Sequence, residues 1–128
     1  MSWKTHRIVF WVTTTIFGAM MAFSGVAYLT VEAVKQAFVH LGFPAYFRVE
    51  LAIFKLLGAG ALLLPVPAKI KEWAYAGFFL TLISAVIAHL ASGDGADKWV
   101  APLILSLFLI ASYRSHMQLS TAANRGRQ

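Results

Sequence analysis

The chain lacks cysteine altogether, and it holds few charged residues for its length. Without thiols there are no disulfides, thiolate metal sites or dithiol redox pairs. Charged residues make up 12% of the 128 positions, about half the share found in soluble domains, which favours lipid rather than water as the main solvent. No phosphate-binding loop, HExxH helix or nucleophile elbow occurs. These absences exclude the enzyme classes that depend on those motifs.

The histidines and the basic residues also lack the grouping that metal or nucleic-acid binding requires. The four histidines are scattered, without the spacing of a metal or haem site. The net charge is +6, but the lysines and arginines lie between apolar runs instead of gathering on one polar face, as a nucleic-acid reader needs. We therefore expect no metal site, no nucleic-acid partner and a lipid bilayer as the principal environment.

What the chain does contain is four long apolar runs, each near the roughly 17–25 residues that cross a bilayer as a helix. The predicted spans are residues 8–30, 45–64, 73–92 and 99–113. The predicted fold class is all-α: an integral membrane four-helix bundle that forms a single domain over residues 1–128. The stretch "VEAVKQAFVHLG" is apolar on one side, which predicts a short interfacial helix between spans one and two. The polar end, about 118–128, predicts a disordered tail.

The basic residues predict the direction of the spans. The N-terminus, the second loop and the C-terminal end hold Lys4, Arg7, Lys69, Lys71, Arg114, Arg125 and Arg127. The first and third loops hold only Lys35 and Lys98. Because lysine and arginine accumulate on the cytoplasmic side, both termini are expected to be cytoplasmic, in the inner cell membrane. A cleaved signal peptide is the alternative for the first run, which is longer than a signal-peptide core and leads directly into more membrane.

The second predicted span, within "YFRVELAIFKLLGAGALLLP", contains three ionisable residues: Arg48, Glu50 and Lys55. A charge at the centre of a spanning helix costs about 2.5–3.5 kcal/mol, so we expect these groups to face other helices or trapped water. At about 100° per residue, Arg48 and Lys55 share one face of this helix with Ala52, Ala59 and Leu62. Small side chains on a face indicate close helix packing. Glu50 points about 140° away from Lys55, so no pair between them is expected.

Depth along the spans groups further polar side chains with these charges. Near the outer end lie His89 on the third span and Ser24 and Tyr28 on the first span. Thr81 and Ser84, on the third span, lie deeper, near Lys55. Together they predict an outward-facing polar pocket that narrows towards Lys55. The candidate catalytic residues are Glu50, Lys55 and His89. The candidate ligand-binding residues are Arg48, Thr81, Ser84, Ser24 and Tyr28.

Each of these residues also has a structural interpretation. Arg48 is close enough to a span end to extend its guanidinium to the headgroups, and His89 is placed to cap a helix end. Thr81 and Ser84 are residue types that often bond to their own helix backbone. Glu50 and Lys55 suit an ion-pair network that only holds the helices together. Intramembrane ionisable groups are nevertheless functional candidates by default.

The region from Gly42 to Asp94 resembles the DoxX-like family of small four-helix membrane proteins. The resemblance lies in the order and spacing of Glu50, Lys55, Leu57-Gly58, Pro65, Lys71-Glu72-Trp73-Ala74, Gly77-Phe78, Ala85 and His89-Leu90. It implies the four-span fold, and it implies that Glu50, Lys55 and His89 recur in relatives. Some relatives are linked to quinone-coupled sulfur oxidation or membrane oxidoreductase complexes, and a distant animal branch assists receptor assembly. Relatives with thiol chemistry need cysteines, which this chain lacks.

Three functions are consistent with these observations. In the first, the pocket binds a quinone-like or other small apolar ligand within a membrane oxidoreductase system. No electron carrier is encoded, so such chemistry would need a bound quinone or a partner subunit. In the second, the protein is a non-catalytic accessory subunit or assembly factor. In the third, it is a small transporter that must form a homo-oligomer. The inner halves of the spans hold almost nothing polar except residues 13–15, which counts against transport.

Overall fold

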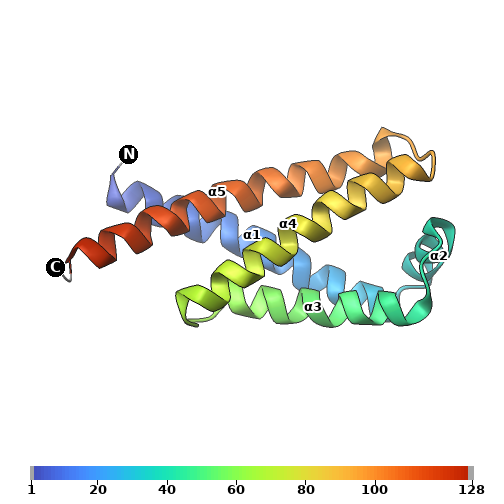
Figure 1. Ribbon diagram of the computed structural model, residues 1–128, viewed down its shortest axis with the longest axis horizontal. Helices are drawn as coiled ribbons and strands as arrows, with labels where there is room; N and C mark the ends of the chain where they lie inside the picture. The colour runs from blue at the N-terminus through green and yellow to red at the C-terminus, as the bar shows by residue number, and fades with distance from the viewer. Residues whose placement is uncertain (1, 127–128) are drawn as a thin grey trace.

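The computed structural model describes residues 2–126, and in that part of the chain it contains five helices and no strand. The helices are α1 (Trp3–Thr30), α2 (Glu32–Leu41), α3 (Ala45–Leu63), α4 (Ala68–Ala91) and α5 (Ala96–Gly126) (Figure 1). The all-α prediction is confirmed. Three helices, α1, α4 and α5, are long and apolar enough to cross a membrane. The fourth long helix, α3, has 19 residues, so its three charged side chains fall within almost any stretch of spanning length, whereas α4 and α5 each contain a longer stretch with fewer charges.

Helix α5 corrects the prediction for the C-terminal end. The expected disordered tail from about residue 118 is helical up to Gly126, while residues 127–128 lie outside the described part. Hydropathy marks where an apolar run ends, but a helix continues as long as its residues allow. No proline and no glycine interrupt the segment before Gly126, Ala122 and Ala123 favour helix, and Ser115 and His116 are buried at its start.

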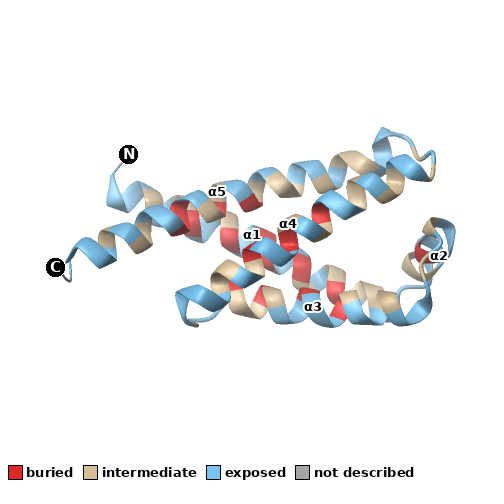
Figure 2. Ribbon diagram, viewed as in Figure 1, coloured by how far each residue is buried: buried red, intermediate tan, exposed pale blue. Residues whose placement is uncertain are grey.

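Four helices pack side by side in a ring of neighbours. Helix α1 packs against α3 and α5, and α4 packs against α5 and α3, while the short α2 packs mainly against α1 and α3 (Figure 1). The buried residues gather at mid-length, as Figure 2 shows. These buried residues form one cluster that also includes Tyr75, and we call its members without a polar group the apolar layer: Phe17, Met21, Ala59, Leu62, Phe78, Leu82 and Leu109. At its centre the rings of Phe17 and Phe78 meet edge to face, with centroids 5.0 Å apart.

The predicted inner face of α3 is confirmed except at Arg48, which is only partly buried. Its buried residues are Ala52, Lys55, Ala59 and Leu62. The backbone of α1 approaches this face closely at Gly25, where a Cβ atom would lie 2.9 Å from Leu56 Cγ and 3.1 Å from the carbonyl oxygen of Ala52. The α1–α3 contact therefore depends on a missing side chain, as is common between membrane helices.

The Gly25→Val substitution is expected to separate α1 from α3. Leu56 can rotate away, but the backbone carbonyl of Ala52 cannot, so we expect a loss of about 1–3 kcal/mol in the free energy of unfolding, typical of overpacking. Unfolding in mixed detergent micelles measures the change. Gly77→Val is the matched control, because a Cβ atom at Gly77 meets nothing within 4 Å. Equal stability of the two variants would contradict the prediction.

Candidate functional site

Lys55 is buried between α3 and α1 without a carboxylate partner among the described residues. Its ammonium donates a hydrogen bond to Ser24 Oγ at 2.8 Å and lies 3.9 Å from the centre of the Tyr28 ring. Ser24 and Tyr28 are one turn apart on α1, so they present a hydroxyl and a ring face together. Both contacts are with neutral groups. The site therefore contains a positive charge that remains available to an anionic or hydrogen-bond-accepting group.

Arg48 and Glu50 play no part in that arrangement. The Arg48 guanidinium donates a hydrogen bond to the backbone carbonyl of Tyr28, in the last turn of α1, where a cation satisfies a free helix-end carbonyl. Glu50 is exposed, and no described residue forms an ion pair or side-chain hydrogen bond with it. Its orientation agrees with the helical phase, which turns it away from Lys55.

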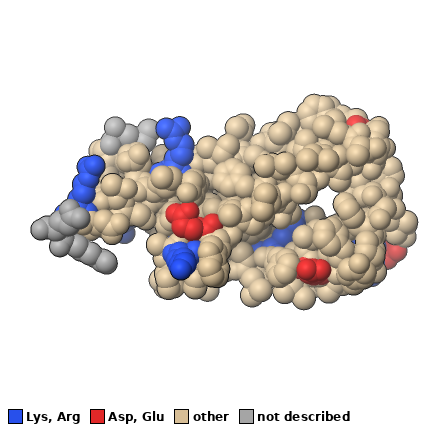
Figure 3. Space-filling model, viewed as in Figure 1, with Lys and Arg blue, Asp and Glu red and all other residues tan. Residues whose placement is uncertain are grey.

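Two adjoining cavities lie between α3 and α4. The loop-side cavity, about 470 Å³, is towards the α3–α4 loop and includes Lys55 in its lining. The α2-side cavity, about 510 Å³, lies under α2 and includes Tyr28, Ser84 and His89. Leu51 and Thr81 line both cavities, so the two adjoin there, and we call the pair the α3–α4 groove. Figure 3 shows this hollow, with basic side-chain atoms recessed in it.

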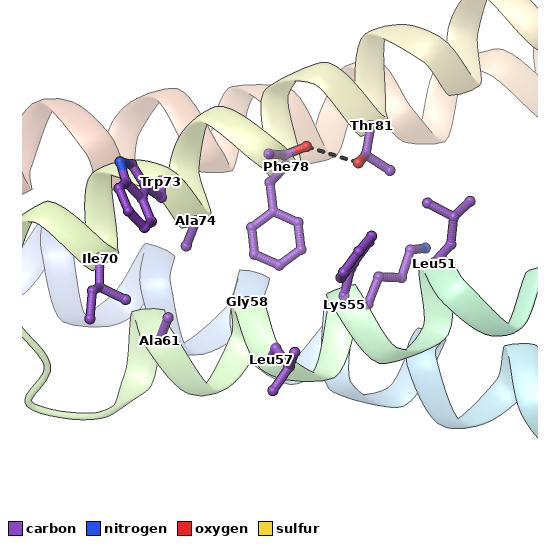
Figure 4. A pocket seen from close by; sticks show the side chains of 12 residues that line it. Leu51, Lys55, Leu57, Gly58, Ala61, Ile70, Trp73, Ala74, Phe78 and Thr81 are labelled. Carbon is purple, nitrogen blue, oxygen red and sulfur yellow. Dashed lines mark hydrogen bonds between the residues drawn. The ribbon is translucent and has the colours of Figure 1, made fainter. Parts of the chain in front are cut away.

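The walls of the groove are mostly apolar. In the loop-side cavity the Phe78 ring extends from α4 towards Gly58 on α3, and the Lys55 side chain runs along the wall towards Leu51 (Figure 4). Gly58 is required there, since a Cβ atom would lie 2.6 Å from the Phe78 ring. The Thr81 hydroxyl donates to the carbonyl of Gly77 in its own helix at 2.8 Å. Thr81 therefore adopts the backbone-bonded arrangement that its residue type also predicted.

The structure thus brings most of the predicted site residues together. Five line the groove: Tyr28, Lys55, Thr81, Ser84 and His89. Ser24 contacts Lys55 from α1 without lining either cavity. Arg48 and Glu50 line neither cavity.

His89 belongs to a cluster with Asp94 and His40 that was not predicted from the sequence. Its Nδ1 donates to one oxygen of Asp94 at 2.7 Å, and Nε2 of His40 donates to the other oxygen at 2.7 Å. Hydrogen bonds from His89 and His40 hold the pKa of the Asp94 carboxyl below its usual value. His40 comes from α2, His89 from the end of α4, and Asp94 from the α4–α5 loop. The sequence indicated only that all three lie near the outer ends of the predicted spans.

A second polar cluster borders the apolar layer at its inner edge, where Tyr75 packs against the layer. The hydroxyl oxygen of Ser112 is 2.6 Å from that of Tyr75 and 2.5 Å from that of Thr14, and all three side chains are buried. Beside them, Nε2 of the buried His116 lies 3.4 Å from a carboxylate oxygen of Glu72. The expectation that the inner halves are nearly free of polar groups is therefore wrong. Ser112 and His116 fall at or beyond the end of the apolar run, where hydropathy does not predict burial.

Lys71 is the other polar residue whose position the sequence did not predict. Its ammonium donates to the carbonyl oxygens of Ala61, Leu62 and Leu64 at 2.9–3.0 Å. These carbonyls lie at or just beyond the C-terminal end of α3, where backbone oxygens lack helical partners. Lys71 therefore ties the start of α4 to the end of α3.

Comparison with known proteins gives one match. The sequence model of the DoxX-like family matches residues 12–112, which include α3, α4 and the groove between them. No curated protein and no solved structure matches the chain significantly.

Proposed function

Because the chain belongs to the DoxX-like family and is a multi-pass membrane protein with three apolar helices long enough to span, we propose that α3 is a fourth span. Lys55, the charge nearest its centre, is buried against α1, which reduces its cost in lipid. The spans then form a four-helix bundle, with α2 in the outer interface. Basic residues at both ends of the chain and in the first turn of α4 support cytoplasmic termini in the inner membrane.

The proposed function is the binding of a small apolar ligand with a polar, hydrogen-bond-accepting head, such as a quinone, in the α3–α4 groove. One observation supports this most strongly: Lys55 has only neutral partners and lines the loop-side cavity of the groove. Each of the two cavities in that groove falls within the roughly 300–1,000 Å³ of small-molecule sites. The apolar walls suit the body of such a ligand, and the ammonium suits an oxygen of its head.

In a membrane oxidoreductase system, these residues would have distinct roles. Lys55 would stabilise negative charge developing on a ligand oxygen, as a fixed cation does in a water-poor site. His89, at the other end of the groove, would exchange protons with the outer surface through its contact with Asp94. A bound quinone would supply the electron-accepting chemistry, and a partner subunit would supply the electrons.

The two other functions have less support. An accessory subunit or assembly factor is consistent with the contacts of Lys55, if these contacts only fix the packing of α1 on α3. Transport would need a polar path through the whole bundle. The apolar layer separates the Lys55 site from the Thr14–Ser112–Tyr75 cluster, so transport by one copy of the chain is disfavoured.

Native mass spectrometry of gently extracted protein tests the proposal. We expect the wild type to retain a lipid-soluble ligand, or to bind added decylubiquinone. Lys55→Met should weaken binding about 10- to 100-fold, because one charge-assisted hydrogen bond contributes about 1.5–3 kcal/mol. Glu50→Gln is the matched control, since Glu50 lies outside the groove, and it should bind as the wild type does.

Two results would decide against a ligand site. If the folded Lys55→Met variant binds the quinone as tightly as the wild type, Lys55 does not hold the ligand. If nothing binds to the wild type and Lys55→Met fails to fold, the buried charge is structural and the accessory function is favoured.

A further inference from the structure

Helix α2 forms a roof over the α2-side cavity. Its apolar side faces the groove through five residues: Ala33, Val34, Ala37, Phe38 and Leu41. Phe38 is buried, and its ring packs edge to face on Tyr28 with centroids 5.0 Å apart. The opposite wall consists of residues of α4, including Ala85, Ala88 and His89. The helix therefore extends from the α1–α3 side of the molecule over a cavity whose other wall is α4.

A single polar link joins this roof to the opposite wall. Within residues 2–126, the contact of His40 with Asp94 is the one side-chain hydrogen bond or ion pair between α2 and the α4–α5 part of the chain. Asp94 in turn accepts from His89, which lines the cavity. Each carboxylate oxygen accepts one N–H, so Asp94 connects a roof residue to a wall residue directly.

The chain has hinge-like positions on both sides of this link. Helix α2 ends at Leu41 and is followed by Gly42, with φ of +83°, and Gly93 next to Asp94 has φ of +75°. A Cβ atom at either glycine would meet nothing within 4 Å. Only Val31 separates α1 from α2. No residue of α2 belongs to the apolar layer, so a movement of α2 leaves that layer intact.

We propose that α2 is a lid over the outer end of the α2-side cavity, and that Asp94, held between His40 and His89, is the latch that holds the lid in place. Opening the latch exposes the cavity to the membrane surface. The lid regulates the groove of the proposed function, but the contact geometry that supports it involves no ligand. Asp94 is a positioning residue here: it acts on access to the groove through α2.

Cysteine labelling tests the lid directly, because the chain has no native cysteine. We would place one reporter in the α2-side cavity, Ala85→Cys, and measure its rate of modification by a sulfonated, membrane-impermeant maleimide in nanodiscs. Adding Asp94→Ala should accelerate labelling at least about fivefold, because two hydrogen bonds to a charged group are lost. A reporter in the loop-side cavity, Gly77→Cys, should not change its rate.

A matched pair at His40 keeps the test decisive if Asp94→Ala disturbs the fold. The His40 side chain is 55% exposed, so its replacement does not disrupt packing. His40→Gln retains an N–H donor near the position of Nε2 and should label slowly, whereas His40→Leu lacks the donor and should label fast. Equal rates for the two variants, or acceleration at both reporters, would overturn the lid. Because labelling needs no quinone, the lid and the proposed ligand can fail separately.

Discussion

Replacing Gly77 with leucine is expected to weaken quinone binding strongly without unfolding the protein. Gly77 lies on α4 and lines the loop-side cavity, and a Cβ atom there meets nothing within 4 Å. A leucine side chain would therefore extend into the cavity and not into a neighbouring helix. Since forcing atoms into occupied space costs about 1–3 kcal/mol, and 1.4 kcal/mol is a tenfold change, the affinity for decylubiquinone should fall about 5- to 100-fold.

The measurement is a decylubiquinone titration followed by native mass spectrometry, with Ala76→Leu as the control. Ala76 is the preceding residue of α4, is exposed and lines neither cavity, so the same side chain is added on another face of the helix. Gly77→Leu should also keep the wild-type unfolding temperature, because it removes a glycine from a helix interior. Unchanged affinity in Gly77→Leu would mean that the loop-side cavity is not where the ligand binds.

The second large effect is on stability. Lys71→Met is expected to lower the free energy of unfolding by about 1.5–3 kcal/mol, the range for hydrogen bonds to a charged group. Methionine retains an unbranched apolar side chain but leaves the carbonyls of Ala61, Leu62 and Leu64 without their donor. Unfolding in mixed micelles measures the loss, which should be accompanied by faster proteolysis in the α3–α4 loop.

Lys69→Met provides the comparison for Lys71. Lys69 is exposed, lies two residues before Lys71 in the first turn of α4, and bonds to none of those carbonyls. Both variants therefore lose one positive charge at nearly the same place, but only Lys71→Met loses the hydrogen bonds. If the two variants were equally stable, the contribution of Lys71 would be that of its charge alone and not of its three hydrogen bonds.

The features that follow from regular helix geometry could be predicted from the sequence. The lengths of the apolar runs predicted the long helices, because spanning length and hydropathy are local properties. The face of α3 with Ala52, Lys55 and Ala59 followed from 100° per residue. Depth predicted that Ser24 lines the outer end of the same pocket, at the level of Arg48, whereas the structure places it deeper, against Lys55. Each of these inferences needs only the helix geometry and a common membrane frame.

Contacts outside that regular geometry could not be predicted. The role of Lys71 depends on the path of the loop before it, which brings its ammonium to three backbone oxygens. Every residue has a backbone oxygen, so the sequence does not indicate which ones a lysine will reach. The meeting of His40 with Asp94 depends on the angle at which α2 leaves α1. For Glu50, its angular position on the helix excluded Lys55 as a partner. The same angle could not show whether Glu50 is exposed or faces a neighbouring helix.

The apolar layer has an electrical consequence. Along α1, Ser24 and Thr14 are ten residues apart, about 15 Å of helix rise, and the layer fills the interval with hydrocarbon side chains such as Phe17 and Met21. A membrane voltage acts on charge that moves across such a barrier, at about 2.3 kcal/mol per elementary charge per 100 mV for the full thickness. Protons that reach Lys55 from the α2 side do not pass through the layer. Ligand chemistry in the groove would then proceed almost independently of the membrane voltage, neither driven by it nor dissipating it.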